Sequence, residues 1–290
     1  MKSIIISSDV KQNCCLGHEL HVTRCVIIDM LLQSYINEND VIVVKNSDKK
    51  FLYAALFKNV LTYCQYIDFI ISIDQKEYNI IDLSPINQNP DFLLTHISIP
   101  NFNFSPRYYS DEFKRALLKI NFRQSTDLIL NKDFIVIHRR YDEDIQKLKM
   151  ACEKFLQENI DLNIIIFNND INELKKDINY NNVILIDNLQ LYATYLNDNK
   201  CRGVISEWSG GGQVAQYCCN KKTIMYYFNH YQSQGYIPMK DQCIANSMSG
   251  DYLQSWDFKN PGDSTILMFN DFNDLLNNIP TNVINAEVVE

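Results

Sequence analysis

Short apolar runs alternate with longer amphipathic stretches over the first third of the chain. Ser3–Ser8 is a short apolar run, and Asp40–Lys45 is a β-branched run typical of a strand buried on both faces of a sheet. Phe51–Ile67 is interpreted as a helix and Asp68–Ile73 as a further strand. A first helix is predicted within His18–Ile36, where apolar residues recur at helical spacing: Leu20, Cys25, Ile28, Leu31 and Leu32.

The same alternation restarts in the second half of the chain. Strands are predicted at Asp133–His138, Leu162–Phe167, Asn182–Asp187, Cys201–Ser206 and Lys222–Phe228. Helices are predicted at Asp142–Ile160, Asp170–Ile178, Leu189–Asp198, Gly212–Cys218 and Asp271–Ile279. Strands that alternate with helices in this way indicate parallel α/β sheets.

The segment between these halves is less regular. Four of the seven prolines lie between Tyr78 and Asn131, where only Ser110–Ile120 resembles a helix. A domain boundary is therefore predicted near Asp127–Lys132, giving one domain over residues 1–127 and another over 128–290. Tyr231–Asp263 is also irregular, and the aromatic residues of Tyr226–Tyr236 suit either stacking on a ligand or a core.

Two parallel α/β domains predict where ligands bind. Such sheets bind ligands beyond the carboxyl ends of their strands, and a cleft between the two domains offers a second crevice. The polar residues that follow each predicted strand are therefore the candidates for function.

The strand at Phe134–Ile137 ends in His138, Arg139 and Arg140. A guanidinium at this position offers paired donors that suit phosphate oxygens, and Asp142 is placed to orient it. The alternative is a surface arginine pair bridged to the acidic residues that follow.

The strand at Cys201–Ser206 leads into the sequence EWSGGGQ. We interpret Glu207–Gly212 as a loop in which glycines allow close approach of a ligand to free N–H groups at a helix start. Glu207 would accept hydrogen bonds from ribose or sugar hydroxyls, and the alternative is a structural turn at a tight helix–strand crossing. The candidate phosphate-binding residues here are Ser206, Glu207, Ser209, Gly210, Gly211, Gly212 and Gln213.

The loop after the first strand supplies candidates for a general base. His18 and Asp9 are the two favoured, with Glu19 behind them, and a surface or capping role is the alternative for each. Cys14 and Cys15 lie in the same loop, but no histidine and asparagine partners suggest a thiol nucleophile.

Composition limits the classes of partner and the cellular location that we expect for the protein. The net charge of −8 argues against sequence-independent nucleic-acid binding, which needs a basic surface. The nine cysteines show no zinc-binding spacing, so reduced thiols in a core are expected. No signal peptide and no transmembrane segment are evident, which predicts a cytoplasmic protein. Frequent Asn and Ile with few Gly and Pro suggest an AT-rich genome, such as that of a giant virus.

Neither GxGxxG nor a Walker A sequence is present. The two halves, the HRRYD sequence at His138–Asp142 and the SEWSGGGQVAQY passage together resemble a GT-B glycosyltransferase. Arg139, Arg140 and Asp142 also resemble the basic motif of GDP-fucose-dependent fucosyltransferases, although His138 is one place late.

The resemblance implies two Rossmann-like domains with parallel sheets facing across a cleft. It implies a GDP- or UDP-linked nucleotide sugar held by the second domain, and an acceptor glycan or protein at the first. It also implies no cofactor and no metal ion, since cationic side chains and a helix dipole would stabilise the leaving diphosphate.

Two alternatives remain open. Ser209, Gly210, Gly211 and Gln213 nearly reproduce the Ser-Gly-Gly-x-Gln loop of nucleotide-sugar 2-epimerases of the UDP-N-acetylglucosamine type. A non-catalytic protein that binds a nucleotide sugar is the other alternative.

Overall fold

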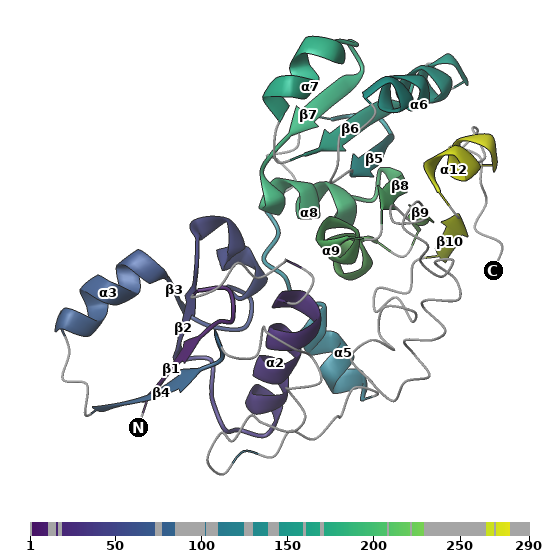
Figure 1. Cartoon of the computed structure of the whole chain (residues 1–290). Helices are drawn as coiled ribbons and strands as arrows, with labels where there is room; N and C mark the ends of the chain where they lie inside the picture. Colours follow the sequence, from purple (N-terminus) through teal and green to yellow (C-terminus); the bar gives the residue numbers. More distant parts are fainter. Residues whose placement is uncertain are drawn as a thin grey trace. The chain divides into compact units, whose positions relative to one another are not determined.

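The computed structural model describes residues 2–10, 16, 19–72, 77–84, 102, 110–124, 130–138, 145–158, 161–168, 171–207, 209–220, 222–228, 265–269 and 271–278. The chain divides into two compact units, with a division between Asn121 and Phe122. Each unit contains a parallel sheet with helices packed on it (Figure 1).

The sheet of the first unit has the strand order β3-β2-β1-β4. Its strands are β1 (Lys2–Ile6), β2 (Val41–Val44), β3 (Asn59–Thr62) and β4 (Tyr78–Asp82), and every pairing is parallel. The helical segments are η1 (Glu19–Thr23, a π-helical turn), α2 (Arg24–Leu32), η2 (Ser47–Leu52, a 3₁₀ helix), α3 (Tyr63–Ser72) and α5 (Asp111–Leu117). The predicted strands at Ser3–Ser8 and Asp40–Lys45 are confirmed as β1 and β2, and β2 is buried along its whole length.

Two predictions for the first unit are wrong. Phe51–Ile67 is not one helix, because it contains the end of η2, the edge strand β3 and the start of α3. Asp68–Ile73 is not a strand, because Asp68 to Ser72 form the second half of α3. The physical reason is that α3 carries apolar side chains on both faces: Tyr66 is buried, whereas Ile67 is 38% and Ile71 78% exposed.

The sheet of the second unit has the order β10-β9-β8-β5-β6-β7, again with only parallel pairings. Its strands are β5 (Phe134–His138), β6 (Asn163–Phe167), β7 (Val183–Ile186), β8 (Cys201–Glu207), β9 (Ile224–Phe228) and β10 (Thr265–Phe269). The helices are α6 (Ile145–Glu158), α7 (Ile171–Asp177), α8 (Leu189–Asn197), α9 (Gly210–Cys218) and α12 (Phe272–Asn278). All predicted strands and helices of this unit are confirmed, and β10 is an additional strand.

The second sheet has the 3-2-1-4-5-6 order of a Rossmann fold when its strands are numbered along the chain. The chain moves outward from β5 toward β7 and then returns to β8 on the other side of β5. The boundary between β5 and β8 is therefore the topological switch point, where this class of sheet binds its ligands. In the first unit the corresponding point lies between β1 and β4.

Buried apolar residues from the strands and helices hold each sheet in place. In the second unit, Phe155 of α6 and Leu275 of α12 pack against side chains of the central strands. In the first unit, Ile4, Val43 and Tyr66 belong to one cluster. These cores fix the carboxyl ends of the central strands, where the candidate site residues lie.

Arg24 is fully buried in the first unit and binds backbone carbonyls. Its Nε donates to Leu52 O at 3.1 Å, Nη1 donates to Leu117 O, and Nη2 donates to Lys119 O at 2.6 Å. These contacts join α2 to the end of η2 and place a cation at the carboxyl end of α5, where helix carbonyls lack intrahelical partners.

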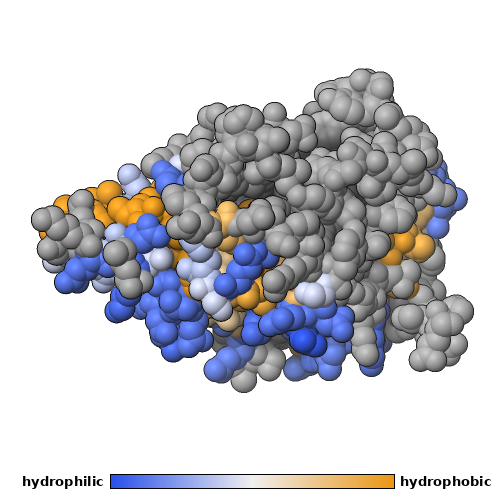
Figure 2. Space-filling model, turned by 90° about the horizontal axis from the view of Figure 1, so that it is seen from below, coloured by the Kyte–Doolittle hydropathy of each residue, from blue (hydrophilic) through white to orange (hydrophobic). Residues whose placement is uncertain are grey.

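Some apolar residues of the first unit face solvent. Tyr63, Ile67 and Ile71 follow one another at intervals of four along α3, and Ile80 of the edge strand β4 is 44% exposed. Figure 2 shows hydrophobic surface on the side where Figure 1 places α3 and β4.

Candidate functional site

The carboxyl ends of β5 and β8 are adjacent at the switch point of the second sheet. His138 and Ser206 are register partners in the two strands. His138 Nδ1 lies 3.1 Å from Ser206 Oγ, and Ser206 Oγ donates to Glu207 O at 3.1 Å. The hydroxyl of Ser206 thus lies between the His138 ring and the Glu207 carbonyl and joins the ends of β5 and β8. Two strand ends predicted separately thus meet at one edge.

The three glycines are helical, which corrects the loop assigned to Glu207–Gly212. Helix α9 begins at Gly210, so Gly210, Gly211 and Gly212 form its first turn and Ser209 is its N-cap. The first hydrogen bond of the helix runs from Gln213 N to Ser209 O at 2.9 Å.

Two of these glycines have a packing role. A Cβ on Gly211 would lie 2.2 Å from His138 Nε2, and one on Gly212 would lie 2.6 Å from Glu207 O. Both distances are far below van der Waals contact. The absence of side chains lets the start of α9 lie directly against the ends of β5 and β8. The structural alternative considered for this passage, a tight helix–strand crossing, is therefore present at Gly211 and Gly212.

Tyrosine hydroxyls hold the first turn of α9 from both sides. Tyr192 of α8 donates to Gly211 O at 3.0 Å, and Tyr227 of β9 donates to Gly212 O. The His138 ring stacks with Phe167 at 5.6 Å between centroids, and Phe167 stacks with Tyr192 at 4.3 Å. All of these rings are buried, so the helix start is rigidly placed.

The amino end of α9 carries polar groups that bonds within the helix do not satisfy. The N–H groups of the first turn have no intrahelical acceptor, as at every helix start. Ser209 is extended, with φ −158° and ψ 176°, and its side chain makes no capping hydrogen bond. Its buried Oγ finds no hydrogen-bond partner among the described residues. By contrast, the N-cap of α8, Asn188, accepts from Leu191 N at 2.8 Å.

The structure describes some of the other residues predicted for the donor site. Glu207 ends β8 and is 1% exposed, and Gln213 lies half-buried in the second turn of α9. Arg139 and Arg140 lie outside the described residues, although they follow His138 directly. The fucosyltransferase-like motif therefore stays a prediction.

The predicted base residues belong to the first unit, and the structure describes one of them. His18 lies outside the described residues. Asp9 follows β1 and is 1% exposed, and its carboxylate forms an ion pair with Lys49 at 2.8 Å. Asp9 Oδ1 also accepts from Ser7 Oγ at 2.8 Å and from Lys45 N at 3.3 Å.

Glu19 lies beside Asp9 in the same buried cluster. Ser7 Oγ is 2.7 Å from Glu19 Oε1, Ser8 Oγ donates to Glu19 Oε2 at 2.9 Å, and Tyr53 donates to Oε1. Burial, followed by the charge of Asp9, raises the pKa of Glu19 above its ordinary value. Burial and the neighbouring Glu19 raise the pKa of the Tyr53 hydroxyl well above its usual value. Sequence analysis placed Glu19 near the site, but not its contact with Ser7 and Tyr53.

The cysteines of the described residues are free thiols. Cys25, Cys152, Cys201, Cys218 and Cys219 are buried, which agrees with the predicted reduced core role. Burial raises the pKa of the Cys201 thiol to about 12, so it is protonated and unreactive at neutral pH. Cys14 and Cys15 lie outside the described residues.

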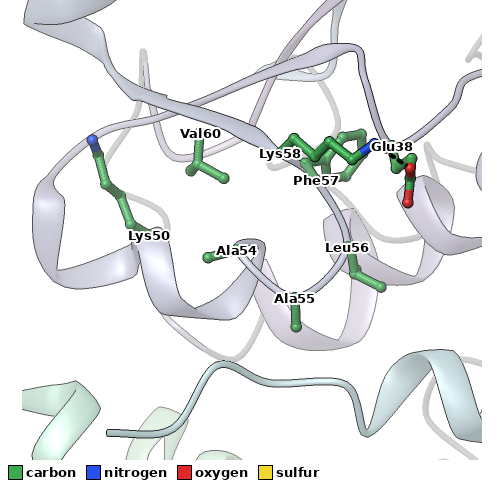
Figure 3. Close-up of a pocket in the computed structure, with 8 residues that line it drawn as sticks. All are labelled: Glu38, Lys50, Ala54, Ala55, Leu56, Phe57, Lys58 and Val60. Atoms are coloured by element: carbon green, nitrogen blue, oxygen red, sulfur yellow. Dashed lines mark ion pairs between the residues drawn. The ribbon is translucent and has the colours of Figure 1, made fainter.

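Two open pockets lie away from these strand ends. One of about 410 Å³ in the first unit lies near the amino ends of β2 and β3, and an ion pair between Lys58 and Glu38 borders it (Figure 3). The other, of about 420 Å³, contains Tyr180 and neighbouring asparagines ahead of β7. Both lie toward the amino ends of strands, the edge at which parallel sheets do not bind ligands.

Comparison with known proteins identifies the fold. No family model and no curated protein sequence matches the chain. The heptosyltransferase WaaC of E. coli, solved with ADP-2-deoxy-2-fluoro heptose, matches with a TM-score of 0.52 at 12% identity and covers 98% of each chain. The E. coli ADP-heptose LPS heptosyltransferase II matches with a TM-score of 0.51 at 10% identity, over 98% of this chain and 96% of that chain.

These likenesses show the fold. The chain has the two-domain α/β architecture of GT-B glycosyltransferases, and this part of the fold prediction is confirmed. No helix among the described residues is both long enough and apolar enough to cross a bilayer. Within the same residues, no cluster of histidine, cysteine and acidic side chains is arranged to hold a metal ion.

Proposed function

We propose that this protein is a glycosyltransferase that takes a sugar from a nucleotide-diphosphate donor and transfers it to an acceptor hydroxyl without a metal ion. The observation that carries the proposal is the amino end of α9. It lies at the switch point of the second sheet, and its N-cap Ser209 has a buried hydroxyl with no partner among the described residues.

A diphosphate suits this position for electrostatic reasons. The first-turn N–H groups of α9 and the positive end of its dipole favour an anion. Gly211 and Gly212 let the helix start lie against His138 and Glu207, which places these N–H groups at the ends of β5 and β8. Ser209 Oγ adds a donor that no capping bond uses. Because the net charge of the protein is −8, local groups such as these, and not the overall charge, must attract a phosphate.

The remaining donor-site residues receive roles from their chemistry. Glu207 would accept hydrogen bonds from ribose or sugar hydroxyls, and Arg139 or Arg140 would bind phosphate oxygens in a bidentate manner. His138 and Ser206 pack against Gly211 and Gly212 in the first turn of α9. Gln213 adds a polar side chain in the second turn. A GDP- or UDP-linked donor is the proposal from the sequence, and an ADP-linked donor enters the test because WaaC was solved with an ADP-sugar analogue.

The reaction proposed is a displacement at the anomeric carbon. The acceptor oxygen forms a bond to that carbon while the bond to the diphosphate oxygen breaks, and the nucleoside diphosphate leaves with the electron pair. If the reaction inverts the anomeric centre, the acceptor proton passes to a base from the loop after β1, either His18 or Asp9. The charge that develops on the leaving diphosphate is stabilised at α9 and by an arginine. The acceptor is a glycan or a protein.

A turnover assay separates the alternatives. The protein is incubated with ADP-, GDP- and UDP-sugars, with and without a mixture of acceptor sugars, and products are identified by mass spectrometry and NMR. Release of nucleoside diphosphate that depends on acceptor supports the transferase. Isomerisation of a UDP-sugar without acceptor would instead establish an epimerase, and donor binding without any conversion would establish a non-catalytic binding protein.

A further inference from the structure

Five side chains at the carboxyl end of β1 form a buried polar cluster whose hydrogen-bond count requires one extra proton. We call Ser7, Asp9, Glu19, Lys49 and Tyr53 the β1 cluster. Ser7, Asp9 and Glu19 are each no more than 1% exposed. The cluster lies at the switch point of the first sheet, in the position that ligand-facing residues occupy in this fold.

The two contacts of the Ser7 hydroxyl show how many protons the cluster needs. Its Oγ lies 2.8 Å from Asp9 Oδ1 and 2.7 Å from Glu19 Oε1, and both distances are those of short hydrogen bonds. A serine hydroxyl has one proton to donate, whereas two ionised carboxylates can only accept. If both carboxyl groups were ionised, the single Ser7 proton could lie in only one of the two contacts. The other contact would then join two oxygen atoms with no proton between them. One carboxyl group must therefore be protonated and donate to Ser7 Oγ.

The surroundings of the two carboxyl groups assign the proton to Glu19. Asp9 has an ammonium group, that of Lys49, at 2.8 Å and accepts a backbone N–H from Lys45. The hydrogen-bond partners given above for Glu19 are all hydroxyl groups, those of Ser7, Ser8 and Tyr53. A cation at hydrogen-bond distance stabilises the ionised form of Asp9, while hydroxyl groups also suit a neutral acid.

We propose that Glu19 carries a proton at neutral pH and donates it to Ser7, which in turn donates to Asp9 and orients that carboxylate. Glu19 and Ser7 are then positioning residues for Asp9, and they do not touch the substrate. This role in catalysis rests on the proposed function, in which Asp9 is one of two candidate bases. The shared proton does not depend on it.

The other charged groups that face Glu19 are consistent with this arrangement. Lys49 favours its ionised form but is bound to Asp9. The charge of Arg24 of α2 acts on Tyr53, and the Arg24 guanidinium binds the carbonyls of Leu52, Leu117 and Lys119. Burial and the charge of Asp9, the two largest effects, both raise the pKa of Glu19.

Infrared spectroscopy of the full chain tests the proton directly. At pH 7 the wild-type protein should show the carbonyl band of a buried protonated carboxyl group, and Glu19→Gln should lack it. The matched control Glu207→Gln changes another buried glutamate and should retain this band. In Asp9→Asn, the band should disappear at lower pH than in the wild type, because the charge of Asp9 no longer raises the pKa of Glu19. A wild-type spectrum without such a band, or one unchanged by Glu19→Gln, would overturn the proposal.

The pH dependence of folding stability gives a second, independent test of the Glu19 proton. A pKa raised above the ordinary 4.5 means that the folded state holds a proton that the unfolded state releases. Stability from this group is fully present below about pH 4.5 and is lost as the pH rises toward the folded-state pKa. Relative to Glu19→Gln, the wild-type folding constant should therefore fall by up to about tenfold per pH unit across this window. A wild type that instead gains stability over Glu19→Gln with rising pH has an ionised Glu19, which contradicts the proposal.

The catalytic role is tested separately once turnover is found. Ser7→Ala should lower kcat and shift the acidic limb of the pH–rate profile while leaving donor affinity unchanged, and Glu19→Gln should retain most of kcat. An unchanged profile in Ser7→Ala would remove the positioning role. If no nucleotide sugar is converted, the proposed function fails, while the infrared and stability results still decide where the proton is.

Discussion

At the scale of single residues, Gly211 shows why the glycine run is needed. The His138 ring fills the place of its missing side chain, and this ring cannot move away because Phe167 and Tyr192 pack around it. Gly211→Ala should therefore destabilise the protein by about 1–3 kcal/mol, the usual cost of overpacking a tight contact. Urea unfolding measures this change.

The double variant His138→Ala/Gly211→Ala provides the control. Removing the ring opens space for the new methyl group, so the double variant should be more stable than the sum of the two single losses predicts. A coupling of about 0.5–3 kcal/mol is expected for residues in contact. Strict additivity would show that the ring is not what excludes a side chain at Gly211.

Two N-cap residues offer a matched comparison of stability and binding. Asn188 makes a capping bond at 2.8 Å, whereas Ser209 makes none. Asn188→Ala should cost about 1 kcal/mol in unfolding free energy and leave nucleotide binding unchanged. Ser209→Ala should be nearly neutral for stability, because its hydroxyl makes no capping bond, and it should weaken the binding of nucleoside diphosphates if this hydroxyl donates to them as proposed. Urea unfolding and titration calorimetry on both variants check this, and equal effects of the two substitutions would contradict the assignment.

Sequence patterns predicted which polar residues and glycines lie at the ends of β5 and β8, but not the role of each residue. A helix start against two strand ends and an anion site both call for glycine, and sequence alone does not separate them. The structure assigns Gly211 and Gly212 to packing against His138 and Glu207. It also joins Glu19 to Asp9 through Ser7, a contact between residues from separate elements that no local pattern encodes.

At the scale of elements, Arg24 links three segments of the first unit. Its guanidinium binds the carbonyl of Leu52 at the end of η2 and those of Leu117 and Lys119 at the end of α5, while Arg24 itself belongs to α2. Arg24→Met should leave these acceptors without their donor and destabilise the protein by about 3 kcal/mol or more. Arg24→Lys retains the charge but not the planar fork, so it should recover only part of the loss.

Chemical denaturation followed by circular dichroism measures both variants. Full recovery by lysine would indicate that charge at the carboxyl end of α5, and not the set of hydrogen bonds, is what matters. A stable Arg24→Met variant would show that the buried carbonyls find other donors.

Element prediction succeeded where burial is uniform and failed where it is not. The strands β2, β5 and β6 are buried along nearly their whole length, so their apolar runs were recognised. The edge strand β4 was missed because only Ile81 of its five residues is buried. In α3, the exposed Ile67 and Ile71 hide the helical period and imitate a β-branched strand.

At the scale of the whole molecule, each sheet presents its polar cluster at its own switch point. In the second unit, His138, Ser206 and the amino end of α9 lie at the ends of β5 and β8. In the first unit, the β1 cluster lies at the end of β1. In the proposed reaction, the amino end of α9 would bind the diphosphate and the β1 cluster would contain a candidate base, Asp9. The fold could be predicted from the alternation of elements. The sugar and acceptor could not, because their contacts depend on side chains rather than on the sheet.

Titration calorimetry with ADP, GDP and UDP, each beside its monophosphate, tests the central claim most directly. The account predicts that at least one diphosphate binds with a dissociation constant of about 1 μM to 1 mM. It also predicts tighter binding than for the matching monophosphate, and weaker binding to Ser209→Ala than to Asn188→Ala. If none of the three diphosphates binds the wild-type protein, or if the second phosphate adds nothing, the amino end of α9 is not a diphosphate site.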